Sequence, residues 1–301
     1  MATSQDPNWP SAASLLSANA KPGLRQVALS GIHTYATSVS ARSATSTPQA
    51  VRSALERYST WSYSDGVDLA EVVSIQDLGD VENPDGPGGN KRVEALLANA
   101  RHPELHLILG GDNAATWLAL SALAGNALDS VGLITLDAHL DMRDGRSNGS
   151  PVRQLLEAGL AAQNVVQVGL ADFSNSAPYA RAAHQAGSHA ITRDELRRLS
   201  VEEAAVRAVT LASRGGKKVY VDIDVDAADR SVVPGCPAAS PGGLSADEMR
   251  RFVRAVVACD EVFAIDFTEV DVERDDRDER TVRLVALLVL EALSGLQRRN
   301  K

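Results

Sequence analysis

Apolar, strand-like runs alternate with helical segments along most of the 301 residues, and this alternation limits the possible folds more than any other feature. Runs such as LITLD (133–137) and VYVDID (219–224) are short and apolar, whereas 246–259 and 282–297 have helical periodicity. The longest predicted helix extends over 193–215. Strands separated by helices form right-handed crossovers, so we expect a three-layer α/β/α fold with a central, mostly parallel sheet.

The domain organisation follows from composition. No linker rich in Pro or Gly divides the sequence, so residues 21–301 are predicted to form one α/β domain. Residues 1–20 are rich in Ser, Ala and Asn and contain two prolines, which predicts a flexible N-terminal arm.

The net charge and the cysteines limit the possible partners and the possible cellular compartment. A formal net charge of −9 argues against nucleic acid and against an anionic membrane surface, so a small molecule is the expected partner. Cys236 and Cys259 lack CxxC spacing and are predicted to be thiols in a reducing compartment. Neither a signal peptide nor a membrane-spanning run is recognisable, so we expect a cytoplasmic protein.

Acidic side chains cluster where two of the predicted strands end. LITL is followed by Asp137, His139 and Asp141, and a second run carries Asp222 and Asp224 with the same spacing. Alternation along a strand would place such residues on one face, at the sheet edge where α/β proteins bind ligands. Carboxylates with one imidazole suit manganese or magnesium better than zinc. Helix caps or surface acids would explain either cluster alone, but less easily both.

Four motifs then occur in a fixed order. They are GGDN at 110–113, DAHLD at 137–141, DIDVDAADRSVVPGCPAASPGGLS from 222, and DFTEVD at 266–271. This order resembles the ureohydrolase superfamily of arginase, agmatinase and formimidoylglutamase, whose motifs are GGDH, DAHxD and SxDxDxxDPxxxPGxxxPxxGGL. SARSATSTPQAVR at 40–52 is similar to the family segment GARxGPxxIR. The resemblance implies an arginase-like fold, two manganese ions per subunit and hydrolysis of an amidine or guanidine C–N bond.

The resemblance also implies the metal ligands. Asp137 and Asp222 would bridge the two manganese ions. His139 and Asp224 would bind one ion, and Asp141 would bind the other.

The sixth ligand of the family is the His of GGDH, and Asn113 stands at that position here. An amide oxygen is as neutral as imidazole but is a weaker donor to a transition metal, so we expect the ion beside Asn113 to be weakly held. Asn113 also allows a different interpretation, in which the protein is a metal-poor relative of the family without catalytic activity.

Two residues are implied to act on the substrate directly. Glu269, in FTEVD, corresponds to the family Glu that holds the cationic nitrogens, although a surface acid at a strand end would look the same. Asp141 would orient the attacking hydroxide and then protonate the leaving amine.

The loop after DAHLD is expected to select the substrate. It reads MRDGRSNGSPVRQ, and Arg153 lies in the first turn of a predicted helix, where a carboxylate would bind. This loop and FSNS at 173–176 resemble formimidoylglutamase more than arginase, which has His in place of Asn148. Asn175 and either Arg143 or Arg146 are further candidates.

The expected function is therefore manganese-dependent hydrolysis of N-formimidoyl-L-glutamate to L-glutamate and formamide, a step of histidine degradation. The alternative within the superfamily is a hydrolase of a guanidino acid or agmatine-type substrate that releases urea. The family resemblance also implies a homo-oligomer.

Overall fold

A computed structural model describes residues 6, 8–17, 19 and 21–300 of the chain. Its centre is a nine-stranded sheet in the order β1-β5-β2-β6-β11-β10-β7-β8-β9, and every neighbouring pair is parallel. The strands are β1 (Leu16–Ser17), β2 (Arg25–Ile32), β5 (Val73–Asp80), β6 (Leu105–Gly110), β7 (Val131–Leu136), β8 (Val165–Leu170), β9 (His189–Thr192), β10 (Lys218–Asp224) and β11 (Val262–Thr268). A separate antiparallel pair consists of β3 (Trp61–Ser62) and β4 (Val67–Asp68).

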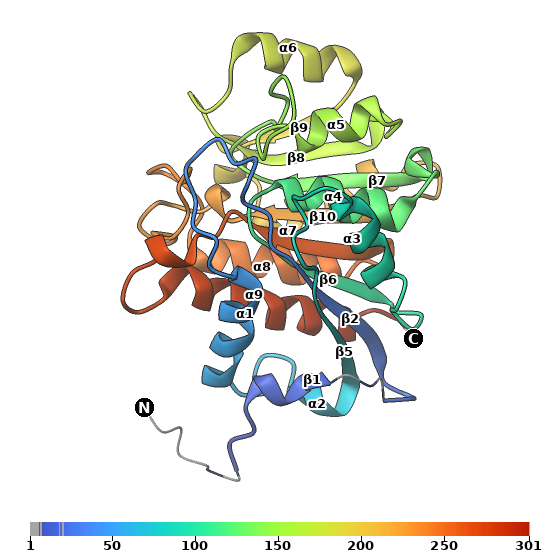
Figure 1. The fold of residues 1–301 in the computed structure, drawn as a ribbon, viewed down its shortest axis with the longest axis vertical. Helices are drawn as coiled ribbons and strands as arrows, with labels where there is room; N and C mark the ends of the chain where they lie inside the picture. Colours follow the sequence, from blue (N-terminus) through green and yellow to red (C-terminus); the bar gives the residue numbers. More distant parts are fainter. Residues whose placement is uncertain (1–5, 7, 18, 20, 301) are drawn as a thin grey trace.

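Helices cover both faces of this sheet, which confirms the predicted three layers (Figure 1). One layer contains α1 (Thr47–Ala54), α7 (Val201–Ala212), α8 (Ala246–Val257) and α9 (Arg280–Gln297). The other contains α3 (Gly89–Leu97), α4 (Ala114–Ala124) and α5 (Pro151–Glu157). The shorter α2 (Leu69–Val72) precedes β5, and α6 (Ala177–Ala186) lies beyond β8. The 3-10 turns are η1 (Ala12–Leu15), η2 (Leu55–Arg57), η3 (Leu128–Ser130), η4 (Ala162–Asn164), η5 (Glu195–Arg197), η6 (Val225–Ala227) and η7 (Val272–Arg274).

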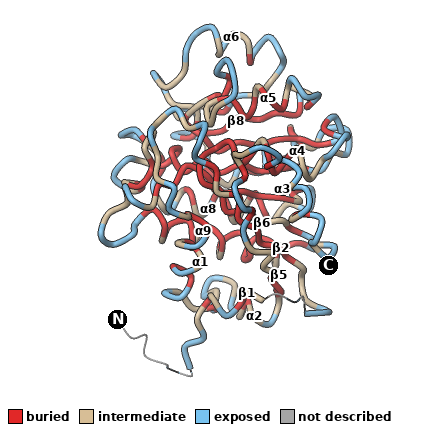
Figure 2. Tube along the Cα trace, viewed as in Figure 1, coloured by how far each residue is buried: buried red, intermediate tan, exposed pale blue. Residues whose placement is uncertain are grey.

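The core lies between the sheet and its two helix layers, and the six strands from β2 to β8 in the sheet order are buried along most of their length (Figure 2). Strands β6, β11, β10 and β7 are neighbours at the centre of the sheet. The four motifs described in the sequence lie at the carboxyl ends of these strands. Parallel strands end at the same edge, so the fold brings the motifs together there.

Part of the predicted N-terminal arm is attached to the sheet. Ala12 and Leu15 are buried, and β1 pairs with β5 through Leu16 and Ile75. Residues 1–5, 7, 18 and 20 of that arm lie outside the described residues.

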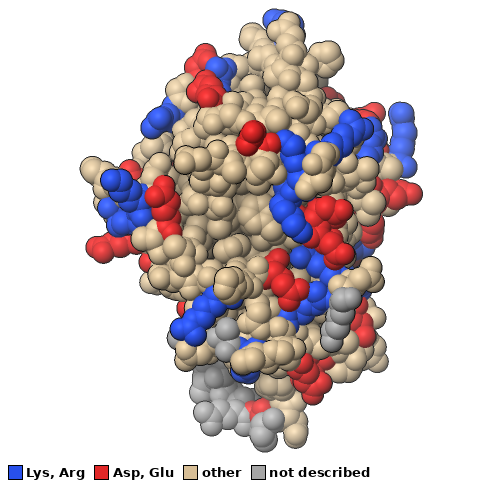
Figure 3. Space-filling model, turned by 90° about the vertical axis from the view of Figure 1, so that its right-hand side faces the viewer, with Lys and Arg blue, Asp and Glu red and all other residues tan. Residues whose placement is uncertain are grey.

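The charge distribution on the surface and the length of the helices are relevant to the expected partners. On the face shown in Figure 3, basic and acidic side chains are interspersed. Among the helices of the described residues, none has the length and apolar character needed to cross a membrane.

Phe252 on α8 provides a test of the core packing. Its side chain is fully buried in the hydrophobic core. Phe252→Ala should therefore lower the free energy of unfolding by about 3–5 kcal/mol. The control is Val206→Ala on α7, which is 53% exposed and should change it by no more than about 0.5 kcal/mol. Urea titration of metal-free protein measures both. Equal effects of the two substitutions would contradict the packing of α8 described here.

Candidate metal centre and substrate pocket

The DAHLD residues converge through a loop and not through strand alternation. Strand β7 ends at Leu136, so Asp137 is the first residue after it, and Asp141 has a left-handed backbone with φ of 51°. The predicted alternation is therefore wrong for His139 and Asp141. Asn175 fixes this loop: its Oδ1 accepts from the Leu140 N–H at 2.8 Å, and its Nδ2 donates to a neighbouring backbone carbonyl at 3.0 Å.

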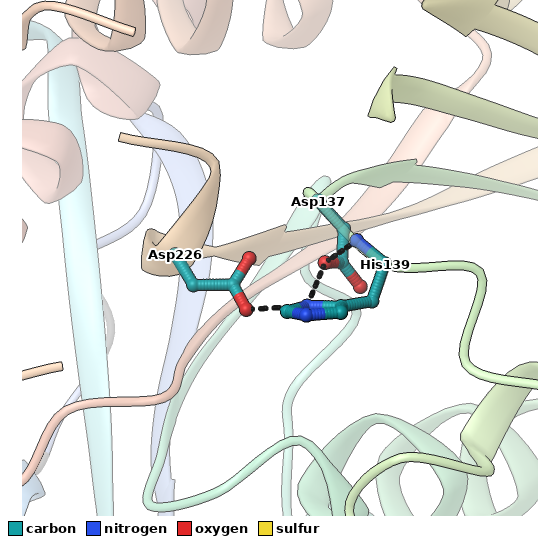
Figure 4. A group of neighbouring side chains, drawn as sticks. All are labelled: Asp137, His139 and Asp226. Atoms are coloured by element: carbon teal, nitrogen blue, oxygen red, sulfur yellow. Dashed lines mark hydrogen bonds and ion pairs between the residues drawn. The ribbon is translucent and has the colours of Figure 1, made fainter. Parts of the chain in front are cut away.

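Asp137, His139 and Asp226 form a compact group of metal-ligand type (Figure 4). One ligand atom from each lies within 4.8 Å of the others. Nδ1 of His139 is 2.7 Å from Oδ2 of Asp226 and 3.5 Å from Oδ1 of Asp137. Asp226 belongs to η6, directly after β10, and the sequence prediction did not include it.

Asp222 lies within β10, two residues before the strand ends at Asp224. It is in register with Asp266 of β11, and both carboxyl groups are buried. Burial, together with the charges of Asp266 and Asp224, raises the pKa of Asp222 well above its usual range. Asp222 is not one of the three residues whose ligand atoms lie within 4.8 Å of one another.

The family motif itself contains the signal that identifies Asp226. Counting back from Pro234-Gly235, the DxD pair of SxDxDxxDPxxxPG falls on Asp224 and Asp226, and Asp222 falls on the Ser. The GGL at 242–244 agrees with this count. By this count Asp224 and Asp226, rather than Asp222 and Asp224, correspond to the DxD pair of the family motif.

Burial and neighbouring carboxylates make it unfavourable for several acids of this cluster to ionise. Burial raises the pKa of Asp141 to about 7, and burial with neighbouring carboxylates raises the pKa of Asp137 and Asp224 well above the usual range. Burial opposes ionisation of Asp226 as well, but the hydrogen bond from His139 lowers its pKa. Within the described residues, Oδ2 of Asp137 has no hydrogen-bond partner. A buried carboxylate oxygen without a donor, surrounded by further carboxylates, fits a divalent cation, which supplies the missing positive charge.

Asn113 touches this cluster with its amide nitrogen. Nδ2 donates to Oδ2 of Asp141 at 2.6 Å, and it is 3.5 Å from a carboxylate oxygen of both Asp222 and Asp224. The amide oxygen, which is the atom that binds metal ions, accepts from the Thr116 hydroxyl at 2.6 Å. Asn113, the predicted ligand, thus lies next to the carboxylates, but its metal-binding oxygen faces Thr116 and its amide nitrogen faces the carboxylates.

Glu269 follows β11 in a left-handed conformation with φ of 68°, and its side chain is 3% exposed. Its Oε1 accepts from the backbone N–H of Asn113 at 2.9 Å and from Nδ2 of Asn148 at 2.8 Å. Its Oε2 accepts from the guanidinium of Arg42, which is 2% exposed. The Asn148 Oδ1 accepts from the Val39 N–H at 2.8 Å. Arg42 lies in the SARSATSTPQAVR segment, and its contact with Glu269 was not predicted from the sequence.

A cavity of about 270 Å³ opens onto these residues. Its lining joins the acid cluster to Glu269 and to polar residues of three loops. It includes His139, Asp141, Arg143, Asn148, Asn175, Asp224, Asp226 and Glu269.

Arg153 lies outside this cavity, contrary to the expected contact with substrate. Its Nη2 is 2.9 Å from Oδ1 of Asp144, its Nε donates to the Met142 carbonyl at 2.9 Å, and its guanidinium packs over the Tyr179 ring. These contacts fix the loop after DAHLD. Arg143 lines the cavity instead, and Arg146 lines a neighbouring hollow on the outer side of α5.

Comparison with known proteins agrees with this geometry. The family model described as Arginase family matches residues 25–295. The chain is 32% identical over 250 residues to formimidoylglutamase of Halalkalibacterium halodurans, covering 80% of this chain and 78% of the relative. It is 32% identical over 262 residues to formimidoylglutamase of Bacillus subtilis, covering 83% and 81%. The chain therefore belongs to the arginase family.

Solved structures show the same fold. The crystal structure of formimidoylglutamase from Bacillus subtilis superimposes with a TM-score of 0.90 and 28% identity, covering 100% of this chain and 96% of that one. Formiminoglutamase of Trypanosoma cruzi, solved with Mn²⁺, superimposes with a TM-score of 0.84 and 25% identity, covering 97% and 100%.

Proposed function

We propose that the protein hydrolyses N-formimidoyl-L-glutamate to L-glutamate and formamide. The observation that carries the proposal is one cavity whose lining joins the acid cluster to Glu269 and Arg143. The substrate has a cationic amidine to meet Glu269 and carboxylates to meet Arg143, so its charges are complementary to this lining. The relatives named formimidoylglutamase support the choice.

The metal centre that we propose contains two Mn²⁺ ions, as the solved Trypanosoma cruzi relative contains Mn²⁺. Asp137, His139, Asp141, Asp224 and Asp226 would hold them. Asp226 thus replaces the predicted Asp222 and shifts the DxD pair by two residues. When bound, the two ions would lower the pKa of a shared water and so supply hydroxide at neutral pH.

The side chains of the cavity would carry the remaining steps. Glu269 holds an amidine nitrogen and places the formimidoyl carbon above the acid cluster. Arg143 binds a carboxylate of the glutamate moiety and thereby fixes its direction. Asp141 accepts, at a carboxylate oxygen, the proton of the hydroxyl group that has added to the formimidoyl carbon. It delivers this proton to the glutamate nitrogen, which leaves as the C–N bond breaks and the carbonyl of formamide forms. Asn175 contributes indirectly, because its contacts are with the backbone of the Asp141 loop.

The cellular setting remains a prediction from the sequence. We infer a cytoplasmic homo-oligomer that acts in histidine degradation on a small-molecule substrate, with neither nucleic acid nor membrane as a partner.

The assay that tests the proposal separates formamide release from urea release. Manganese-loaded protein should release formamide from N-formimidoyl-L-glutamate and little urea from a panel of guanidino acids and agmatine. Urea from guanidinobutyrate or a similar compound, without formamide, would replace the proposed function by the ureohydrolase alternative. Metal analysis of the same sample distinguishes the non-catalytic alternative, which requires neither bound manganese nor turnover.

A further inference from the structure

Glu269 is unusually well supplied with hydrogen-bond donors for a residue that binds a cationic substrate. A carboxylate has about four lone-pair positions. The backbone N–H of Asn113 and the Nδ2 of Asn148 fill those of Oε1, and Arg42 fills one of Oε2. Within the described part of the chain this leaves one position, on Oε2, for the substrate.

Arg42 and Asn148 are held in these places independently of the substrate. Arg42 and Glu269 are buried at 2% and 3% exposure, so neither charge could remain unpaired without a large desolvation cost. Asn148 is oriented by the Val39 N–H, which donates to its Oδ1 at 2.8 Å, so its Nδ2 must face Glu269. The two donors are thus part of the folded site.

We propose that Arg42 and Asn148 make Glu269 selective for a formimidoyl group over a guanidino group, an inference that rests on the proposed function. A protonated formimidoyl group attached through nitrogen carries three N–H bonds, whereas a guanidino group carries five. The additional amino group would enter a buried site in which Glu269, the nearest carboxylate, has no second free lone-pair position to accept a hydrogen bond. Buried N–H donors without acceptors cost binding free energy, so the guanidino analogue is rejected by its additional donors.

Asn148→Ala tests this proposal with a matched pair of substrates. N-formimidoyl-L-glutamate and N-carbamimidoyl-L-glutamate differ only in that an amino group replaces a C–H hydrogen. Removal of Nδ2 frees one position on Oε1, so the ratio of kcat/KM for the guanidino compound to that for the formimidoyl compound should rise about 10-fold or more. Loss of activity on both substrates in equal proportion would overturn the proposal.

Asn175→Ala is the control. Asn175 lines the same cavity but bonds only to the backbone at Ala138 and Leu140, so its removal should leave that ratio unchanged. An equal rise of the ratio in Asn175→Ala would assign the effect to a loosened cavity and overturn the role of Asn148.

Wild-type protein gives a second measurement that does not depend on the stability of a variant. Calorimetric titration of the manganese-loaded protein with formamidinium and with guanidinium should show formamidinium bound about 10-fold more tightly. Equal affinities would overturn the selectivity of Glu269 while leaving formamide release, and hence the proposed function, intact. Absence of formamide release from the wild type would instead remove the proposed function itself.

Discussion

Asp226→Asn should lower turnover by more than ~100-fold and should reduce the bound manganese below two ions per chain. The reason is the position of Asp226 opposite His139, with its Oδ2 2.7 Å from Nδ1 and its Oδ1 accepting the Ala138 N–H at 3.1 Å. An amide at this position keeps the size but removes a negative charge from a group that must offset two divalent ions. Formamide release and metal analysis on the same preparations measure the two effects.

The matched control is Asp222→Asn. Burial and the carboxyl group of Asp266 raise the pKa of Asp222, and an amide keeps the size and shape of that carboxyl group. We therefore expect manganese content and turnover within about threefold of the wild type, because the substituted group lies outside the proposed ligands. The reverse result, with Asp222→Asn losing metal and Asp226→Asn retaining it, would restore the ligand pair first expected from the sequence.

Most of the fold could be predicted because its signals are local. Apolar runs end where β6, β7, β10 and β11 end, and the intervening periodicity matches the observed helices. The long helix predicted over 193–215 is wrong, because Ser200 begins α7 with a capping box formed with Glu203. The preceding residues form only η5. A capping box inside a helical pattern is visible in the sequence, so this boundary could have been found.

The site was predicted less completely because its geometry depends on loops. Motif spacing was sufficient to name Asp137, His139 and Asp141, but their convergence comes from a left-handed residue after the strand, which alternation cannot reveal. Asp226 was recoverable by counting from Pro234-Gly235. The contact between Arg42 and Glu269 joins residues 227 positions apart, and no local pattern encodes it.

Asn113→His should tighten the weaker manganese ion by ~10–100-fold. In the structure Nδ2 of Asn113 is 2.6 Å from Oδ2 of Asp141 and faces the carboxylates that are proposed to hold the metal. An imidazole nitrogen at this place is a good donor to manganese, whereas the amide oxygen is occupied by the Thr116 hydroxyl at 2.6 Å. Activity at limiting manganese should rise accordingly. At saturating manganese it should not rise, because both sites are then filled in either protein.

Thr116→Val provides the comparison for this substitution. It removes the shorter of two hydrogen bonds to the Asn113 oxygen, the other being donated by the Thr268 hydroxyl at 3.4 Å, and it adds no ligand. Any gain in manganese affinity should therefore be smaller than that of Asn113→His. A gain as large in Thr116→Val would mean that the released amide oxygen is itself an adequate ligand. An unchanged affinity in Asn113→His, measured by calorimetry, would show that position 113 lies outside the coordination shell. Asn113 would then act through its hydrogen bonds to Asp141 and Glu269 alone.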